Sequence, residues 1–439
     1  MKIIIGVHHF PPNYRGGAEQ RALRTAHALQ SRGYEVQAIA VEDIQSGPPN
    51  GVAWEDGVFE GVPVRRLRFN LSGAPDPFRW EYDNLWIGEH LETWLEEQQP
   101  DIFHLFSGYL LTGSALRIAQ SMRIPCVLTL TDYWFLCRRI SLLRSNGDIS
   151  TLPIDPLRCA RCLGEERRRF RWLGRVVPTL MDSYWRQQHQ QVERFADRYQ
   201  FLLETLSGVD AIISPSQFLR SVFVEVGVPA TKIIFSRQGR DFPGLDLTVP
   251  EKTTSSDLRI GYIGQIAPHK GVHVLFDAMQ LLPDARIKVY AYGDTDQFPS
   301  YAAQLRRICE KDARLTLAGP FDAHQISQVM RGLDVIVVPS LWYENSPNVI
   351  LEAFAHRTPV IASDLGGMAE LVRNGVDGLL FTHGDAASLA ERLRRLLAEP
   401  DLLDAFQAGI EPVKSVKSEV DELEEVYRGV IPKNAPGSA

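Results

Sequence analysis

Residues 334–353 read DVIVVPSLWYENSPNVILEA, and this stretch decides the fold. It opens with a short, β-branched apolar run at 334–340, which predicts a buried strand. Pro347 then stands where a helix is expected to begin, because the missing N–H of proline costs nothing in the first helical turn. A buried strand followed closely by a helix is the repeating unit of α/β proteins with a parallel sheet.

The same alternation of apolar strand and amphipathic helix extends in both directions from this stretch. Nearly continuous hydrophobic strands separated by helices indicate a parallel sheet that is covered on both faces. In the first half, strands are expected at 2–8, 35–41, 102–106, 125–130, 211–214 and 232–235, with a helix at 18–32. In the second half, strands are expected at 258–263, 286–291, 314–317, 334–338 and 359–362, with helices at 272–282, 301–310, 323–331, 348–356 and 386–397.

A polar segment, 243–257 (PGLDLTVPEKTTSSD), interrupts this alternation with two prolines and few apolar residues, which is typical of a linker. We therefore predict two tandem Rossmann-like, doubly wound α/β domains, with the ligand site in the cleft between them. The first domain spans 1–242 and carries a helical, Arg-rich insertion near 140–200. The linker spans 243–257, the second domain 258–412, and a last helix 413–431.

Composition limits the functional classes. The 439 residues are 44% hydrophobic and 23% charged, as in soluble globular proteins. The formal charge of −7 gives no overall positive field for nucleic acid. No run of about eighteen apolar residues is present to span a bilayer, the apolar N-terminal run is too short for a signal peptide, and five cysteines do not form a disulfide framework. We expect a cytoplasmic protein.

Two carboxylates flank the helix start in the opening stretch. The backbone amides of Asn348 and Val349 are expected at the positive end of the helix, which suits a phosphate. Glu344 precedes that helix and Glu352 lies about one turn into it, so the pair could hold hydroxyls on either side of the phosphate. The alternative is that Glu344 only caps the helix and Glu352 lies on the surface.

Two further strand ends suit the same ligand. Gly264 ends the strand 258–263, where a glycine allows close approach of a ligand, and Lys270 brings a cation to the start of the following helix. Together with the helix start at Asn348 this favours a diphosphate. Gly16 and Gly17 follow the first strand, but they are not part of a Rossmann G-x-G-x-x-G or a P-loop.

These residues resemble those of the retaining glycosyltransferases of family 4, which have the GT-B fold. The second half resembles the donor domain through Glu344 and Glu352 (the family's E-x7-E), Gly264, Lys270-Gly271, and Gly366-Gly367. The first half resembles the acceptor domain through residues 16–19 (GGAE) and 99–104 (QPDIFH).

The resemblance implies a role for each residue. Glu352 would bind the ribose of a nucleotide, Glu344 the hydroxyls of the donor sugar, and Lys270 the diphosphate; the last helix would cross back onto the first domain. We expect Glu344, Lys270 and Asp132 to serve catalysis. The expected donor-binding residues are Gly16, Gly17, Gly264, Gln265, Lys270, Gly319, Glu344, Asn348, Val349 and Glu352.

The chain departs from the family pattern at three positions. Gln265 replaces the usual arginine, so one phosphate cation is missing or comes from elsewhere. Thr131 precedes Asp132 where many members carry histidine, and Asp132, His8 or His9 would contribute instead. Arg357 stands where glycine is favoured, and a left-handed conformation there would cost about 1 kcal/mol.

Weaker signals leave alternatives open. Asp294-Thr-Asp296 is a D-x-D pattern, but a loop with capping acids is favoured over a metal site. Cys137, Cys159 and Cys162 are three ligand types for zinc without an evident fourth, so core or surface thiols are favoured.

A cluster of arginines with Trp172, at 167–175, fits either an anionic membrane surface or a solvated helix face neutralised by Glu165 and Glu166. Contact with the inner membrane face therefore stays open beside a purely cytoplasmic location.

The sequence thus predicts a retaining glycosyltransferase that uses a nucleotide sugar, a UDP- or GDP-sugar, and no metal or other cofactor. The acceptor is a glycan, a lipid-linked molecule or a small molecule. A GT-B nucleotide-sugar epimerase, which needs no acceptor, and a nucleotide-sugar-binding module without transfer activity are the alternatives. A nicotinamide dehydrogenase is disfavoured because neither half has the dinucleotide fingerprint.

Overall fold

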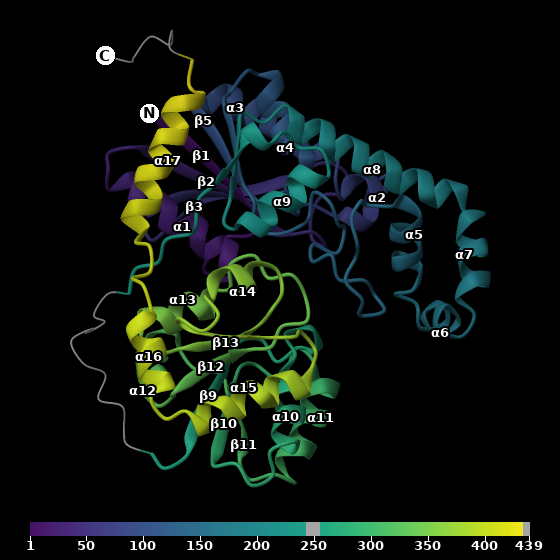
Figure 1. Ribbon diagram of the computed structural model, residues 1–439. Coiled ribbons are helices and arrows are strands. Elements are labelled where there is room, and N and C mark those ends of the chain that lie inside the picture. The colour runs from purple at the N-terminus through teal and green to yellow at the C-terminus, as the bar shows by residue number, and fades with distance from the viewer. Residues whose placement is uncertain (243–254, 433–439) are drawn as a thin grey trace. The chain divides into compact units, whose positions relative to one another are not determined.

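The computed structural model describes residues 1–242 and 255–432, and they form two compact units, each built on its own sheet (Figure 1). Unit 1 comprises Met1–Gly239 together with the segment that begins at Val416, and unit 2 comprises Arg240–Ser415. Much of the predicted linker, 243–254, lies outside the described residues. The chain passes from unit 1 to unit 2 between Gly239 and Arg240, and returns to unit 1 between Ser415 and Val416.

Unit 1 holds an eight-stranded sheet in the order β3-β4-β2-β1-β5-β6-β7-β8, parallel except for β3. Its strands are β1 Lys2–Val7, β2 Glu35–Asp43, β3 Ala53–Phe59, β4 Val62–Arg68, β5 Ile102–Phe106, β6 Cys126–Thr129, β7 Ala211–Ser214 and β8 Ile233–Phe235. Its α-helices are α1 Gly17–Gln30, α2 Pro77–Trp80, α3 Leu85–Gln98, α4 Thr112–Ser121, α5 Pro156–Gly164, α6 Arg168–Val176, α7 Pro178–Arg186, α8 His189–Ser207, α9 Gln217–Glu225 and α17 Val416–Val430.

Unit 2 holds a six-stranded, fully parallel sheet in the order β11-β10-β9-β12-β13-β14. Its strands are β9 Leu258–Ile263, β10 Ile287–Tyr292, β11 Leu315–Gly319, β12 Val335–Val338, β13 Val360–Ser363 and β14 Gly378–Phe381. Its α-helices are α10 Val272–Gln280, α11 Pro299–Cys309, α12 Ile326–Arg331, α13 Asn348–Ala355, α14 Gly366–Leu371, α15 Ala386–Ala398 and α16 Leu402–Gly409.

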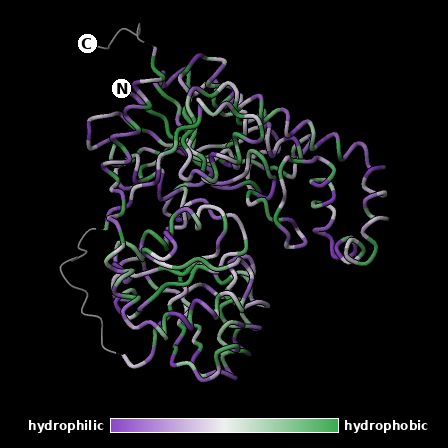
Figure 2. The backbone as a smooth tube through the Cα atoms, in the orientation of Figure 1, coloured by the Kyte–Doolittle hydropathy of each residue, from purple (hydrophilic) through white to green (hydrophobic). Residues whose placement is uncertain are grey.

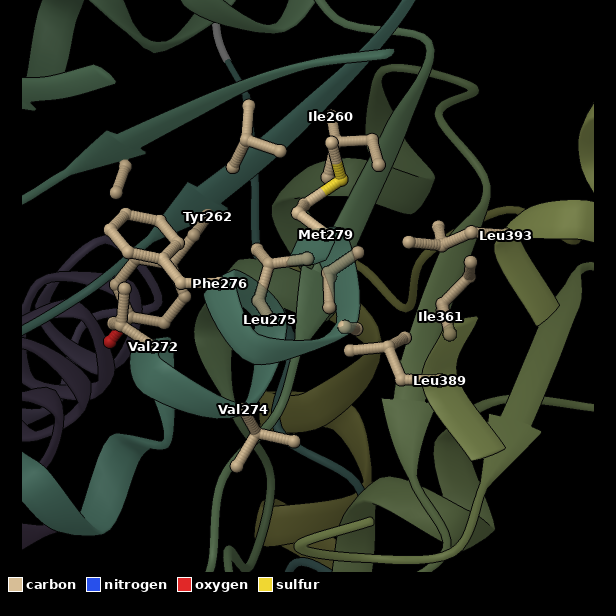
Figure 3. Packing of buried hydrophobic residues seen from close by; sticks show 14 of the residues in the cluster. Ile260, Tyr262, Val272, Val274, Leu275, Phe276, Met279, Ile361, Leu389 and Leu393 are labelled. Atoms are coloured by element: carbon tan, nitrogen blue, oxygen red, sulfur yellow. The ribbon is translucent and has the colours of Figure 1, made fainter. Parts of the chain in front are cut away.

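The sheet of unit 2 is covered on both faces, as its continuous hydrophobic strands require. In Figure 2, the central strands of the sheets are coloured as hydrophobic segments of the chain. Figure 3 shows one core, in which Leu275 and Met279 of α10 lie near Ile260 of β9, with Leu389 and Leu393 of α15 beside them. A second core consists of residues of α12, α13 and α14 and of strand residues, such as Ile336 and Val338, that alternate with the strand residues of the first core.

The hairpin of β3 and β4 has no counterpart among the predicted strands. Nearly all of β3 is exposed because it pairs with β4 alone, at the edge of the sheet. A buried, parallel strand shows as an apolar run, and an exposed, antiparallel edge strand does not. The first sheet is therefore mixed rather than purely parallel.

The last helix completes the core of unit 1. Val420 and Tyr427 of α17 are fully buried in one cluster with Ala22 and Ala26 of α1, and Figure 1 shows α17 in yellow near α1 and β1. Arg21 forms a buried ion pair with Glu419, with 2.6 Å between Nη2 and Oε1.

A buried histidine also holds α17. The Tyr427 hydroxyl lies 2.7 Å from Nδ1 of His104 in β5, and the other ring nitrogen of His104 lies 2.7 Å from the Thr129 hydroxyl. Burial, with a smaller contribution from Arg21, lowers the pKa of His104 to about 3, so the ring is neutral at physiological pH.

The Arg-rich segment after residue 140 forms α5 to α8. The long helix α8 begins among α5 and α7 and runs back to α4 beside the sheet (Figure 1). Among the residues that the structure describes, no helix is long and apolar enough to cross a membrane.

Candidate functional site

The segments that follow β9 and β12 approach each other closely in unit 2. The Leu341 amide donates to the His269 carbonyl at 2.8 Å. Gly271 has φ 74°, and a Cβ at this position would lie 1.9 Å from the Pro339 carbonyl oxygen. Only glycine therefore fits between the end of the Lys270 turn and the end of β12.

This approach brings Lys270 onto Glu344. The Lys270 ammonium lies 2.6 Å from Oε1 of Glu344. The same oxygen accepts hydrogen bonds from the Trp342 indole at 2.8 Å and the Ser340 hydroxyl at 3.0 Å. Lys270 also lies over the Trp342 ring, 4.8 Å from its centroid. Glu344 is thus not a simple helix cap, since its carboxylate is the centre of a built polar cluster.

The charge of Glu344 is set by these neighbours. Its side chain is only 12% exposed. Burial by itself would raise the pKa of Glu344, but the Lys270 charge and the hydrogen bonds from Lys270, Trp342 and Ser340 outweigh burial and lower the pKa. Glu344 therefore stays ionised at neutral pH, as an acceptor of hydrogen bonds rather than a proton donor.

The loop that carries Glu344 packs on the first turn of α14. The Gly367 amide donates to the Glu344 carbonyl at 2.7 Å. A Cβ on Gly367 would lie 1.9 Å from the Asn345 carbonyl oxygen, so a larger residue would push the loop away. The predicted Gly366-Gly367 pair thus supports the site through backbone packing.

At the same carboxyl edge of the sheet, the ends of β9 and β10 and the residues after β11 border a cavity of about 740 Å³. Gly264, Gln265 and Glu352 line it, together with Tyr292 and Phe321. Gly319 ends β11, and its carbonyl accepts the Gly293 amide at 3.0 Å. Asn348 and Val349 form the first turn of α13.

Arg240 also lines this cavity, and no motif in the sequence pointed to it. Its Nη2 lies 2.6 Å from Oε1 of Glu352, and both side chains are 18% exposed. The two residues are 112 positions apart, so no local pattern could reveal the pair. The one signal in the sequence was Gln265, which stands where the family usually carries an arginine. The Gln265 side chain donates a hydrogen bond to Gln297.

The predicted residues Gly16, His8 and Asp132 lie in unit 1. Gly16 caps the start of α1, and His8 lies 3.2 Å from Glu19 of that helix. Asp132 accepts hydrogen bonds from the Ser107 hydroxyl at 2.7 Å and the Trp134 amide at 2.8 Å. It therefore joins the segments after β5 and β6.

Arg357 adopts the left-handed conformation considered from the sequence, with φ 54°. Its guanidinium donates to the Ile410 carbonyl at 2.7 Å, which helps to hold this backbone.

Neither weak metal pattern forms a ligand cluster. Within 1–242 and 255–432, no group of three or more His, Cys, Asp or Glu side chains is placed to hold a metal ion. Asp294 accepts the Asp296 amide at 2.8 Å, as a loop-capping acid does. The described cysteines are free, and burial raises the pKa of Cys159 to about 12, so this thiol stays protonated.

Comparison with known proteins covers both units. Residues 16–237 match the family model described as glycosyl transferase 4-like domain, and residues 257–399 match that described as glycosyl transferases group 1. A phosphatidyl-myo-inositol mannosyltransferase of Mycobacterium leprae is 34% identical over 410 residues, which cover 91% of this chain and 88% of that protein.

Solved structures show the same fold. HepE of Anabaena, in complex with UDP, superposes with a TM-score of 0.66 at 18% identity, over 98% of this chain and 100% of that chain. A glycosyltransferase of Rickettsia africae gives a TM-score of 0.65 at 16% identity, over 99% of both chains. The predicted GT-B fold is thereby confirmed.

The packing of Gly367 on the Glu344 loop makes a prediction. Gly367→Ala should displace the loop and disrupt the Lys270–Glu344 pair, lowering the melting temperature and transferase activity together. Gly332→Ala is the control, because a Cβ there meets only the Val329 carbonyl, at 3.3 Å. Differential scanning calorimetry and activity assays would check both variants. Wild-type stability and activity in Gly367→Ala would contradict the packing argument.

Proposed function

This chain is a glycosyltransferase that belongs to family 4, and we propose that it transfers a sugar from a UDP- or GDP-sugar to an acceptor with retention of configuration. The acceptor is a glycan, a lipid-linked molecule or a small molecule. The observation that carries the proposal is the Lys270–Glu344 cluster, at the same sheet edge as the cavity that Glu352 lines. The Anabaena relative with the same fold binds UDP and UDP-glucose, which supports a nucleotide-sugar donor.

The charges of the site suit loss of a nucleoside diphosphate. As the bond from the anomeric carbon to the diphosphate oxygen breaks, negative charge develops on that oxygen. Lys270 and the amino-terminal end of α13, at Asn348 and Val349, would stabilise this charge. Glu352 would hold the ribose hydroxyls, and Glu344 the hydroxyls of the donor sugar.

Retention would follow from attack on the face that the diphosphate leaves. The acceptor oxygen forms its bond to the anomeric carbon there, and its proton passes to the departing phosphate oxygen. Glu344 is a poor covalent nucleophile because Oε1 already accepts three hydrogen bonds. Isolation of a glycosyl ester on Glu344 would contradict this mechanism.

The donor is tested by a thermal-shift screen with UDP-, GDP-, ADP- and dTDP-sugars. A ligand at one hundred times its dissociation constant stabilises the fold by about 2.7 kcal/mol. We expect a shift with a UDP- or GDP-sugar, and Glu352→Gln should abolish most of it. Glu344→Gln should retain nucleotide affinity but lose turnover, and Lys270→Met should weaken diphosphate binding.

Two results would contradict these roles. If Glu344→Gln and Glu352→Gln reduced nucleotide affinity equally, the separation between sugar and ribose contacts would be wrong. If a nucleotide sugar bound but no acceptor were ever glycosylated and the donor were epimerised, transfer would be replaced by epimerisation.

We further propose that Arg240 supplies the phosphate cation that Gln265 lacks. Arg240 and Gln265 line the same cavity, and Arg240 is already placed on Glu352. A guanidinium can contact a carboxylate and a phosphate at once, because its five N–H donors form a planar fork. The cation would thus come from a different segment of the chain.

Substitution of Arg240 tests whether its guanidinium binds the phosphate. Arg240→Met should weaken UDP or GDP binding about ten- to hundredfold, since a hydrogen bond to a charged group is worth about 1.5–3 kcal/mol. Adding Gln265→Arg should restore part of that loss, and Arg286→Met, at an exposed position, should have no effect. Titration calorimetry would measure the affinities; tighter binding by Arg240→Met would mean that Arg240 blocks Glu352.

We also propose that α6 and α7 contact an anionic membrane. Trp172, Val176 and Leu180 are 62%, 56% and 65% exposed, and the arginines 167–169 beside them are exposed as well. The two acids expected to neutralise these arginines pair elsewhere: Glu165 with Arg161 and Glu166 with Arg139. Exposed aromatic and aliphatic side chains beside arginines are typical of interfacial helices.

Vesicle flotation would test this contact. The wild-type chain should float with vesicles that contain phosphatidylglycerol and remain in solution with phosphatidylcholine alone, because basic residues near an anionic surface contribute about 1 kcal/mol each. Trp172→Asp with Leu180→Asp should abolish flotation, while Val58→Asp, at an exposed residue of β3, should not. Equal flotation of all three proteins would refute the assignment.

A further inference from the structure

Unit 2 contains a second cavity, of about 600 Å³, next to the cavity that Glu352 lines, here called the donor cavity. This volume falls within the range of small-molecule sites. The wall comes from the turn before α10, the first turn of α10, residues 297–300 and one face of α11. These segments follow β9 and β10, at the edge of the sheet where doubly wound domains bind their ligands.

The wall of this second cavity carries no formal charge. Among the residues that the structure describes, none that lines it is an aspartate, glutamate, lysine or arginine. The histidine of the wall, His273, is neutral at physiological pH because burial lowers the pKa of its ring. A charged ligand would lose its hydration here without meeting an opposite charge, which is costly. The cavity therefore suits a neutral ligand, in contrast to the donor cavity with its Arg240 and Glu352.

The aromatic rings of the wall are held by their neighbours. The Tyr301 hydroxyl accepts a hydrogen bond from the His273 amide at 3.0 Å and lies 2.8 Å from Nδ1 of the same histidine. Burial raises the pKa of Tyr301 to about 12, so this hydroxyl stays protonated. Phe298 is half-buried, and its ring meets that of His269 edge-on, with 6.2 Å between the centroids. The apolar part of the cavity is thus formed by rings with fixed contacts.

Uncharged polar side chains complete the wall. Gln297, Ser300 and Gln304 line the cavity and are exposed to solvent. An amide side chain and a hydroxyl group each offer both donors and acceptors of hydrogen bonds. A hydrocarbon ligand would bury these groups without partners, which costs free energy, whereas the hydroxyls of a sugar would satisfy them. Aromatic rings in turn pack against the C–H groups on one face of a sugar ring.

The loop 293–298 separates the two cavities and is held from both sides. The Gln265 side chain, which lines the donor cavity, donates a hydrogen bond to Gln297, which lines both cavities. On the other side, the Arg306 guanidinium of α11 donates to the Thr295 hydroxyl at 3.0 Å. The second cavity is therefore a site of its own beside the donor cavity, with a shared wall.

We propose that this second cavity is an accessory carbohydrate site, which binds a neutral sugar ring of a saccharide other than the nucleotide sugar. Phe298 and Tyr301 supply the apolar contacts, and Gln297, Ser300 and Gln304 bind the hydroxyls. The inference goes beyond the proposed transfer reaction and does not depend on it, because this wall is distinct from the donor cavity apart from the shared Gln297. Such a site keeps a saccharide chain next to the donor cavity.

Saturation-transfer NMR on the full chain would test the site, with methyl glucoside, methyl mannoside, methyl galactoside, cellobiose and maltose as probes. At least one probe should receive saturation, both with and without UDP or GDP. Gln304→Leu, which removes the amide, and Phe298→Leu, which removes the ring, should each weaken its binding about tenfold, as expected for loss of one good contact. Gln280→Leu is the matched control, at an exposed position of α10 outside the cavity, and should bind like the wild type.

Three results would overturn the assignment. One is the absence of saturation transfer to every probe from wild-type protein that melts cooperatively. Another is equal affinity for the probe in wild type, Gln304→Leu and Phe298→Leu. The third is displacement of the probe by a UDP- or GDP-sugar but not by UDP or GDP, which would place the sugar of the donor itself in this cavity. Probe binding in a protein that binds no nucleotide would keep this site and refute the donor proposal instead.

Discussion

The site in unit 2 depends on one close approach of backbone, between the turn that ends at Gly271 and Pro339, the residue that follows β12. A side chain at Gly271 would overlap the Pro339 carbonyl, so the two segments meet only because residue 271 lacks a Cβ. This contact brings Lys270 within 2.6 Å of Glu344. The lowered pKa of Glu344, the orientation of Trp342 and the position of the loop on α14 follow from it.

Both units contain cations that lie on carboxylates. In unit 2 the cations Lys270 and Arg240 each lie on one carboxylate, at a sheet edge where a diphosphate would add two more negative groups. In unit 1, Arg138 pairs with Glu81 and Arg139 with Glu166, while Arg198 lies over the Trp134 ring. The charges at the sheet edge of unit 2 support the proposed diphosphate ligand.

Much of this architecture was predictable, because buried parallel strands and amphipathic helices leave a periodic signal. The strand expected at 334–338 is β12, and the helix expected at 348–356 is α13, which places Glu344 and Glu352 correctly along the chain. The β3–β4 hairpin escaped prediction because β3 is an exposed edge strand and β4 interleaves polar residues with its buried ones, so neither forms an apolar run. Arg240 escaped because a pair separated by 112 positions has no local pattern. The left-handed Thr112 and Ile140 could not be foreseen either, since their residue types disfavour that conformation.

The place of α17 in unit 1 has a consequence for how the chain is made. Tyr427 and Val420 belong to the same core as Ala22 and Ala26, yet the whole of unit 2, Arg240–Ser415, is synthesised between them. At translation rates of about 5–20 residues per second, unit 1 waits roughly ten to thirty-five seconds for its last helix. During that interval the groove beneath α17 exposes apolar surface and the buried partners of His104 and Arg21 are missing. The first unit therefore completes its core only after the second unit has been synthesised, although the second unit can complete its own sheet as soon as it emerges.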